Sequence, residues 1–205
     1  MAMIDTGWMR EQELLDEVSK MQGWQKMALM AFCISRMLIS YKTFVKQTSS
    51  HQKELKVIQY ALDSVWQWIS DPCPYPVETN LHDLCLNASP NNNWASPYED
   101  HPLFEVSSIA CQATALLTIG LPHPTMQQLL KVCSLGTDAV SLLVQQSALR
   151  EDSIDPSSPF FAKELLEHDL MQYELKHQRQ QIKLLQLARE NCIARGFIRS
   201  MVFGA

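Results

Sequence analysis

Glycine, charged residues and long apolar runs are all scarce in this sequence. Glycine accounts for only 6 of 205 residues, which excludes a collagen-like or other glycine-rich fibrous chain. Charged residues make up 19% of the chain and hydrophobic residues 46%, a balance that excludes a disordered polypeptide. A chain of this size can bury about two-thirds of its unfolded surface, so it can form a core without disulfides or metals.

Neither a leader nor a membrane-spanning run is evident. The first residues include Asp5, Glu11 and Glu13 and contain no continuous apolar stretch, so they do not resemble a secretory signal. No run of about 18 apolar residues occurs, and the nearest approach, Val106–Leu121, is interrupted by serine, threonine and glutamine. We therefore expect a cytoplasmic protein that does not bind a membrane, with this segment forming a buried central helix.

Basic residues are too few to form a nucleic-acid surface. The formal net charge is −5, and the stretch from Asp71 to Ala148 holds seven acidic residues against one basic residue, Lys131. Because affinity for nucleic acid depends mainly on lysine and arginine contacts to phosphates, we expect no nucleic-acid binding.

The six cysteines are dispersed along the chain: Cys33, Cys73, Cys85, Cys111, Cys133 and Cys192. Disulfide scaffolds concentrate cysteines in loops, whereas four of these six fall within apolar helical patterns, as reduced core cysteines do. We therefore predict that neither a disulfide nor a structural metal supports the fold. Cys111, on the most apolar helix, should have a raised pKa and be inert.

Apolar residues recur at intervals of three or four, which predicts helices, and no strand-like alternation competes. The helix ranges expected are 9–21, 24–46, 50–70, 80–86, 102–119, 124–149 and 159–195. Apolar residues surround nearly the whole circumference of the second helix, which is typical of a buried one. Gly136 interrupts the sixth helix, where it would let a neighbour approach closely. The predicted fold is all-α, a single-domain bundle with a long C-terminal helix.

Several stretches carry a family resemblance. They are Gly23 to Met37 (GWQKMALMAFCISRM) followed by Tyr41 and Phe44, Leu62 to Trp66 (LDSVW), Ala110 to Ala113 (ACQA), and Arg195-Gly196. Together they resemble the YjaG-like bacterial protein family of unknown function (DUF416). Ser35 departs from that pattern, because the family tends to carry an acid before the arginine. The resemblance implies an all-helical fold and supplies no activity, substrate or cofactor.

Metal-binding patterns are incomplete. Glu174 and His177 have the Glu-x-x-His spacing of di-iron bundles, but a second such pair and the further glutamates that those sites need are missing. Cys73, His82 and Cys85, with His101, have irregular spacing and no Cys-x-x-Cys pair, unlike zinc sites. We predict no metal and no cofactor, and read these residues as packed cysteines, surface histidines and a solvated helix face.

Catalytic motifs are also missing: the sequence has no Gly-x-Ser-x-Gly elbow, no glycine-rich phosphate loop and no dinucleotide fingerprint. No catalytic residue is assigned. An enzyme site needs titratable groups converging on a cleft, and the apolar helices carry few acids or histidines. We favour a non-enzymatic interaction or regulatory module, and a small-molecule- or metal-dependent helical enzyme with its site between helices stays the alternative.

The last helix is the expected interaction surface. Acidic residues precede basic ones along it, so two antiparallel copies could pair opposite charges, and we predict a twofold homodimer. A further protein partner stays open, and so does a monomer whose long helix spans its own bundle. The candidate interface residues are Phe160, Phe161, Ile193, Phe197, Ile198, Met201, Val202 and Phe203.

Overall fold

The computed structural model describes residues 11–70, 80–92, 97–121, 123–151 and 161–188. These residues contain eight α-helices and no strand, which confirms the all-α prediction. The helices are α1 (Glu11–Ser19), α2 (Gly23–Thr48), α3 (Gln52–Ser70), α4 (Leu81–Asn87), α5 (Phe104–Ile119), α6 (Met126–Glu151), α7 (Phe161–Glu167) and α8 (Asp169–Leu187). A short 3-10 helix, Pro90–Asn92, follows α4.

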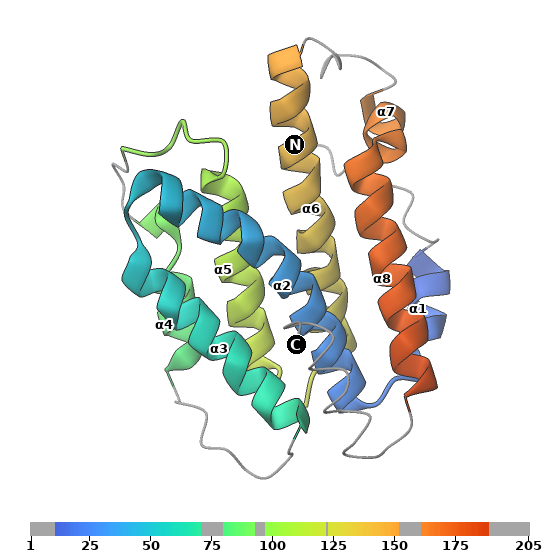
Figure 1. The fold of residues 1–205 in the computed structure, drawn as a ribbon. Helices are drawn as coiled ribbons and strands as arrows, with labels where there is room; N and C mark the ends of the chain where they lie inside the picture. The colour runs from blue at the N-terminus through green and yellow to red at the C-terminus, as the bar shows by residue number, and fades with distance from the viewer. Residues whose placement is uncertain (1–10, 71–79, 93–96, 122, 152–160, 189–205) are drawn as a thin grey trace.

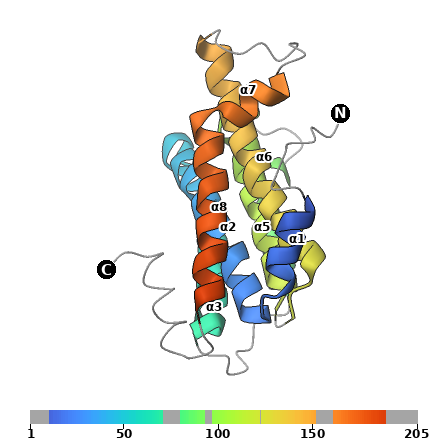
Figure 2. The ribbon, with the colours of Figure 1, turned by 90° about the vertical axis from the view of Figure 1, so that its right-hand side faces the viewer.

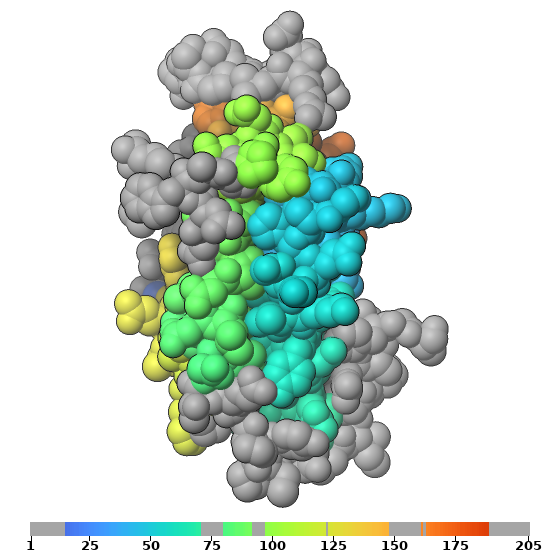
Figure 3. Space-filling model, turned by 90° about the vertical axis from the view of Figure 1, so that its left-hand side faces the viewer, coloured from blue at the N-terminus to red at the C-terminus, as the bar shows by residue number. Residues whose placement is uncertain are grey.

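Helix α2 is the centre of the bundle. It packs against α3, α5, α6 and α8, and α5 packs in turn against α4 and α6 (Figure 1). Helices α3 and α4 cover the face of the molecule that lies opposite α8 (Figure 3). Helices α2 and α5 therefore lie inside the bundle, and α8 forms one outer edge.

The sequence of α2 explains its central place. The side chains of five consecutive residues, from Met27 to Ala31, are fully buried, so the helix is covered on every side. Among the residues that the structure describes, α2 is the one helix long and apolar enough to cross a membrane, so it matches better than the Val106–Leu121 segment singled out above. However, 67% of its most apolar stretch is buried inside the protein, as in the core helix of a bundle.

The C-terminal helix is shorter than the sequence suggested. Within the range expected to form one helix, 159–195, the described residues form α7 and α8 with a break at His168. His168 has an extended backbone, with φ −65° and ψ 137°, and its Nδ1 accepts a hydrogen bond of 3.2 Å from the N–H of Leu170. Figure 2 shows α7 turned away from the axis of α8. The turn lets Leu165 and Met171 pack together against Val144 of α6 in a small second core.

Candidate functional site

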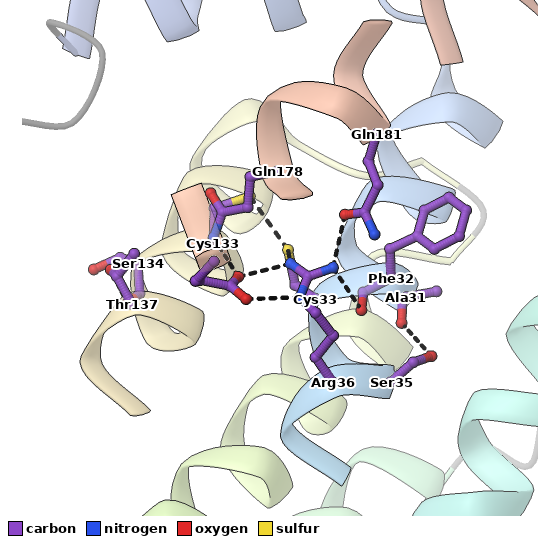
Figure 4. A network of polar contacts seen from close by, with 11 residues as sticks. Ala31, Phe32, Cys33, Ser35, Arg36, Cys133, Ser134, Thr137, Gln178 and Gln181 are labelled. Carbon is purple, nitrogen blue, oxygen red and sulfur yellow. Dashed lines mark hydrogen bonds and ion pairs between the residues drawn. The ribbon is translucent and has the colours of Figure 1, made fainter. Parts of the chain in front are cut away.

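A buried ion pair links α2 to α8. Arg36, in the middle of α2, donates from Nε to Oε2 of Glu174 at 2.7 Å and from Nη2 to Oε1 at 2.6 Å (Figure 4). The Glu174 side chain is 6% exposed and the Arg36 side chain 20%. This parallel two-bond geometry is the strongest form of an arginine–carboxylate contact, and burial shields it from water.

Neighbouring amides and a carbonyl complete the hydrogen bonds of this pair. Nη1 of Arg36 donates to Oε1 of Gln181 at 2.8 Å and to the carbonyl oxygen of Phe32 at 3.3 Å. Gln178 donates from Nε2 to Oε1 of Glu174 at 2.7 Å. Buried charges are tolerated when such partners replace water, so the cluster is internally satisfied.

Helix α6 approaches this cluster through a glycine. A Cβ atom added at Gly136 would lie 3.3 Å from Oε1 of Glu174 and 3.6 Å from Nε2 of Gln178. The absence of a side chain therefore leaves room for the carboxylate, as the sequence suggested for this position. The glycine lets α6 and α8 pack closely at the level of the ion pair.

Two cysteines lie beside the guanidinium. Nη2 of Arg36 is 3.5 Å from Sγ of Cys33 on α2, and this sulfur is 3.9 Å from Sγ of Cys133 on α6. Both residues are almost completely buried, with exposures of 1% and 2%. The structure thus brings together two thiols that are 100 residues apart in the chain.

The environment makes these two thiols unequal. The hydrogen bond with Cys133, together with the positive charge of Arg36, lowers the pKa of Cys33 in spite of burial. The same hydrogen bond and burial raise the pKa of Cys133 well above its ordinary value. Burial opposes the charge of Arg36, but Cys33 and Glu174 outweigh it and raise the arginine pKa. Of the two thiols, Cys33 lies beside the guanidinium, so its thiolate is the one that the positive charge favours.

Comparison with known proteins places the chain in a family. Residues 13–200 match the family described as "Protein of unknown function (DUF416)". The chain belongs to the DUF416 family. The crystal structure of a DUF416 family protein from Shewanella baltica OS155 is similar to it, with a TM-score of 0.75, 14% identity and coverage of 92% of each chain. At this identity the likeness shows the fold alone. No curated protein matches the chain.

The metal patterns read from the sequence do not converge in this DUF416 chain. Glu174 faces inward to Arg36, whereas the ring of His177 packs against Tyr173 with the ring centroids 4.1 Å apart and the ring planes tilted by 54°. His82 contacts the carbonyl oxygen of Ala115, and Cys73 lies outside the described residues. His101, from the zinc pattern, packs its ring against Phe44 with the ring centroids 5.1 Å apart. Among the residues that the structure describes, no three His, Cys, Asp or Glu side chains form a metal-binding group.

The remaining described cysteines behave as core residues. Burial raises the pKa of Cys85 to about 12. Burial also raises the pKa of Cys111, and the charge of the nearby Cys85 adds to the effect. Tyr41, next to Cys111, donates its hydroxyl hydrogen to the carbonyl oxygen of Ala88 at 2.8 Å. The raised pKa expected for Cys111 is therefore confirmed.

Sequence reasoning missed the buried cluster, although a signal was present. Arg36 is the only charged residue between Met27 and Tyr41, and a lone charge in an otherwise buried helix needs a buried partner. The partner could not be identified, because Glu174 is one of several acids near the C-terminal end of this DUF416 sequence. The contact between Cys33 and Cys133 left no local pattern at all.

One face of α8 points away from the bundle, at the front of the molecule in Figure 2. Six residues spaced alternately by three and four form a row along this side, here called the outer row: Leu170, Tyr173, His177, Gln180, Leu184 and Leu187. Leu184 is half-buried and also packs against the main core. Leu170, Tyr173 and Leu187 are 47%, 59% and 81% exposed. Such spacing aligns side chains along one side of a helix in the way that a partner helix recognises.

The candidate interface residues mostly lie beyond these helices. Phe161 is half-buried and packs against the second core with Leu165 and Val144, so part of its surface is used within the fold. The other members, Phe160, Ile193, Phe197, Ile198, Met201, Val202 and Phe203, lie outside the described residues. Among the acids expected to pair between copies, Glu174 is occupied by Arg36.

Proposed function

We propose that this DUF416 chain is a non-enzymatic interaction module that pairs with a second copy of itself through the outer row of α8. The observation that carries this proposal is the pattern of polarity along the row. Two apolar residues lie at each end, and His177 and Gln180 lie between them. A twofold contact needs a surface that is complementary to itself, and this order reads the same from both directions.

An antiparallel pair of α8 helices would match this pattern residue by residue. Leu170 would lie opposite Leu187 of the second copy, and Tyr173 opposite Leu184. The two polar residues at the centre would then face each other across the twofold axis. Burial of the exposed leucines and tyrosine would supply the hydrophobic stabilisation, and the polar centre would fix the register.

The buried cluster supports a structural rather than a catalytic use of the polar residues. Arg36 and Glu174 satisfy each other, and Gln178 and Gln181 take up further hydrogen-bonding positions. An acid or base that exchanges protons with a substrate must reach that substrate. In this cluster the two charged groups are bonded to each other and join α2 to α8.

The setting that we propose for the module is the cytoplasm, with neither nucleic acid nor a membrane as its ligand. The net charge of −5 and the acidic middle of the chain argue against a nucleic-acid ligand. The apolar tail residues Phe197 to Phe203 are proposed to extend the same dimer contact.

Light scattering coupled to size-exclusion chromatography tests the dimer across the micromolar concentration range. The intact chain should have the mass of a dimer, and Tyr173→Glu should be a monomer, because the charge would be buried at the contact. The matched control is Tyr60→Glu on α3, whose tyrosine is 50% exposed on another helix; this variant should stay dimeric. Circular dichroism should show all three proteins equally helical.

A monomeric intact chain at every concentration would overturn the proposal. A dimer that survives Tyr173→Glu would place the contact elsewhere and remove the outer row from it. Truncation after Arg195 should weaken the dimer if the tail takes part, and an unchanged dissociation constant would remove the tail from the interface.

A further inference from the structure

We propose that Cys33 and Cys133 form a redox-active dithiol, an oxidation site for hydroperoxides that closes to a disulfide between α2 and α6, with Arg36 as the group that activates Cys33. The site is separate from the outer row, so it holds whether or not α8 forms a dimer.

The geometry of the thiols already approaches that of a disulfide. Their sulfur atoms are 3.9 Å apart, and a disulfide requires about 2.0 Å. Both side chains lie on long helices that pack directly against each other. To form the bond, the two sulfurs must come roughly 2 Å closer together.

A cation beside one of the two thiols determines which thiol reacts first. A thiolate, and not a thiol, attacks an electrophile, and an adjacent arginine favours the thiolate. Nη2 of Arg36 lies 3.5 Å from Cys33 Sγ, and the pKa of Cys33 is lowered while that of Cys133 is raised. The Arg36 side chain is 20% exposed, so the cluster reaches the protein surface at this arginine.

The chemistry proceeds in two balanced steps. The Cys33 thiolate attacks one oxygen of the hydroperoxide, the O–O bond breaks, and the leaving oxygen takes up a proton, which leaves a sulfenic acid on Cys33. Cys133 Sγ then attacks the Cys33 sulfur, its proton joins the leaving hydroxide, and water departs. With hydrogen peroxide, two thiols and one peroxide give one disulfide and two water molecules.

The chain contains its own comparison for this site. Cys85 and Cys111 are also buried and close enough for the charge of one to affect the other. Burial raises the pKa of both thiols. Their neighbour Tyr41 carries no positive charge, so it cannot favour a thiolate as Arg36 does beside Cys33. Oxidation is therefore expected at Cys33 and Cys133 and not at this second pair.

Treatment of the folded full-length chain with hydrogen peroxide tests the site. After unfolding and alkylation, the number of free thiols should fall from six to four, and a peptide map should join Cys33 to Cys133. The variant Cys133→Ser should stop at the sulfenic acid and lose one thiol, whereas Cys33→Ser should lose none. The matched control Cys111→Ser should still form the disulfide. The variant Arg36→Gln, which removes the positive charge beside Cys33, should react several-fold more slowly.

Retention of all six thiols by the folded chain would overturn the inference, and so would a peptide map that joins any other two cysteines. Loss of the disulfide in Cys111→Ser would show that the second pair takes part. An unchanged rate in Arg36→Gln, with helicity equal to that of the parent chain, would remove Arg36 from the site.

Discussion

Arg36 and Glu174 are 138 residues apart in the chain and meet through two hydrogen bonds of 2.7 and 2.6 Å between α2 and α8. The contact joins a helix at the centre of the bundle to a helix at its edge. Because both charges are largely withdrawn from water, each one depends on the other for its solvation.

Removal of either charge alone should strongly destabilise the protein. We expect Arg36→Met or Glu174→Leu to lower the free energy of unfolding by about 3 kcal/mol, since each leaves an unpaired buried charge. The double variant should lose much less than the two single variants together. Urea unfolding of the four proteins measures the difference. Additive losses would show that the two side chains act independently.

Gly136→Ala should lower the free energy of unfolding although alanine is the better helix former. The new Cβ would lie 3.3 Å from Glu174 Oε1, and that oxygen is held by Arg36 and Gln178. We expect a net loss of about 1 kcal/mol, the crowding outweighing the gain in helix propensity. Adding Glu174→Asp, whose side chain is shorter, should make the alanine substitution less costly. A more stable Gly136→Ala chain would contradict this reading of the contact.

Alkaline pH should destabilise the fold through Cys85. Its pKa is raised from 9.0 to about 12, so above pH 9.0 the unfolded chain releases the proton that the folded chain keeps. The free energy of unfolding should therefore fall with rising pH, by about 1.4 kcal/mol per pH unit for this thiol. Denaturant titrations at several pH values should show a shallower fall for Cys85→Ala. Equal slopes would exclude Cys85 as the source.

Oxidation of Cys33 and Cys133 should stabilise the chain. The disulfide would close a loop between residues 100 positions apart, which constrains the unfolded state. We expect a gain of about 2–4 kcal/mol, below the full loop-closure value because the sulfurs must move. Thermal unfolding of the oxidised chain, before and after reduction, measures it. The Cys33→Ser variant, treated in the same way, should show no change.

Salt should strengthen the proposed dimer. Lys176 and Lys183 are exposed beside the outer row, and an antiparallel pair would bring these lysines close to those of the second copy. Screening of their repulsion should lower the dissociation constant as the salt concentration rises. Sedimentation equilibrium at several salt concentrations measures this. A dimer that dissociates with salt would indicate pairing of opposite charges instead.

Much of the fold could be predicted because each helix has apolar residues at a regular spacing that is visible in its own sequence. The apolar circumference of α2 indicated its central place, and the ends of the first six predicted helices lie within two residues of the observed ones. The break at His168 could not be predicted, because neither proline nor glycine marks it. It is stabilised by a ring nitrogen and by the packing of Leu165 and Met171, both of which depend on the tertiary structure.

The candidate site was less predictable than the fold. Glu174 and His177 suggested a shared ligand face, but the helix turns the first inward and the second outward. The contact of Cys33 with Cys133 depends on how α2 packs against α6. Because the two residues are 100 positions apart, no local sequence pattern indicates the contact. By contrast, the segment from Gly23 to Met37, which carried the family resemblance, contains both Arg36 and Cys33.

The same segment contributes a second contact to α8. Gln25 accepts a hydrogen bond of 2.8 Å from the N–H of Gln22 at the start of α2, and donates from Nε2 to the carbonyl oxygen of Leu185 at 2.5 Å. Gln25 and Arg36 are eleven residues apart, and so are Glu174 and Leu185 on the antiparallel α8. Eleven residues make about three helical turns, so both contacts form in one register only. If α8 slid along α2 by a single turn, the Gln25–Leu185 and Arg36–Glu174 contacts would both break. We therefore expect α8 either to dock in this register or to detach along its whole length.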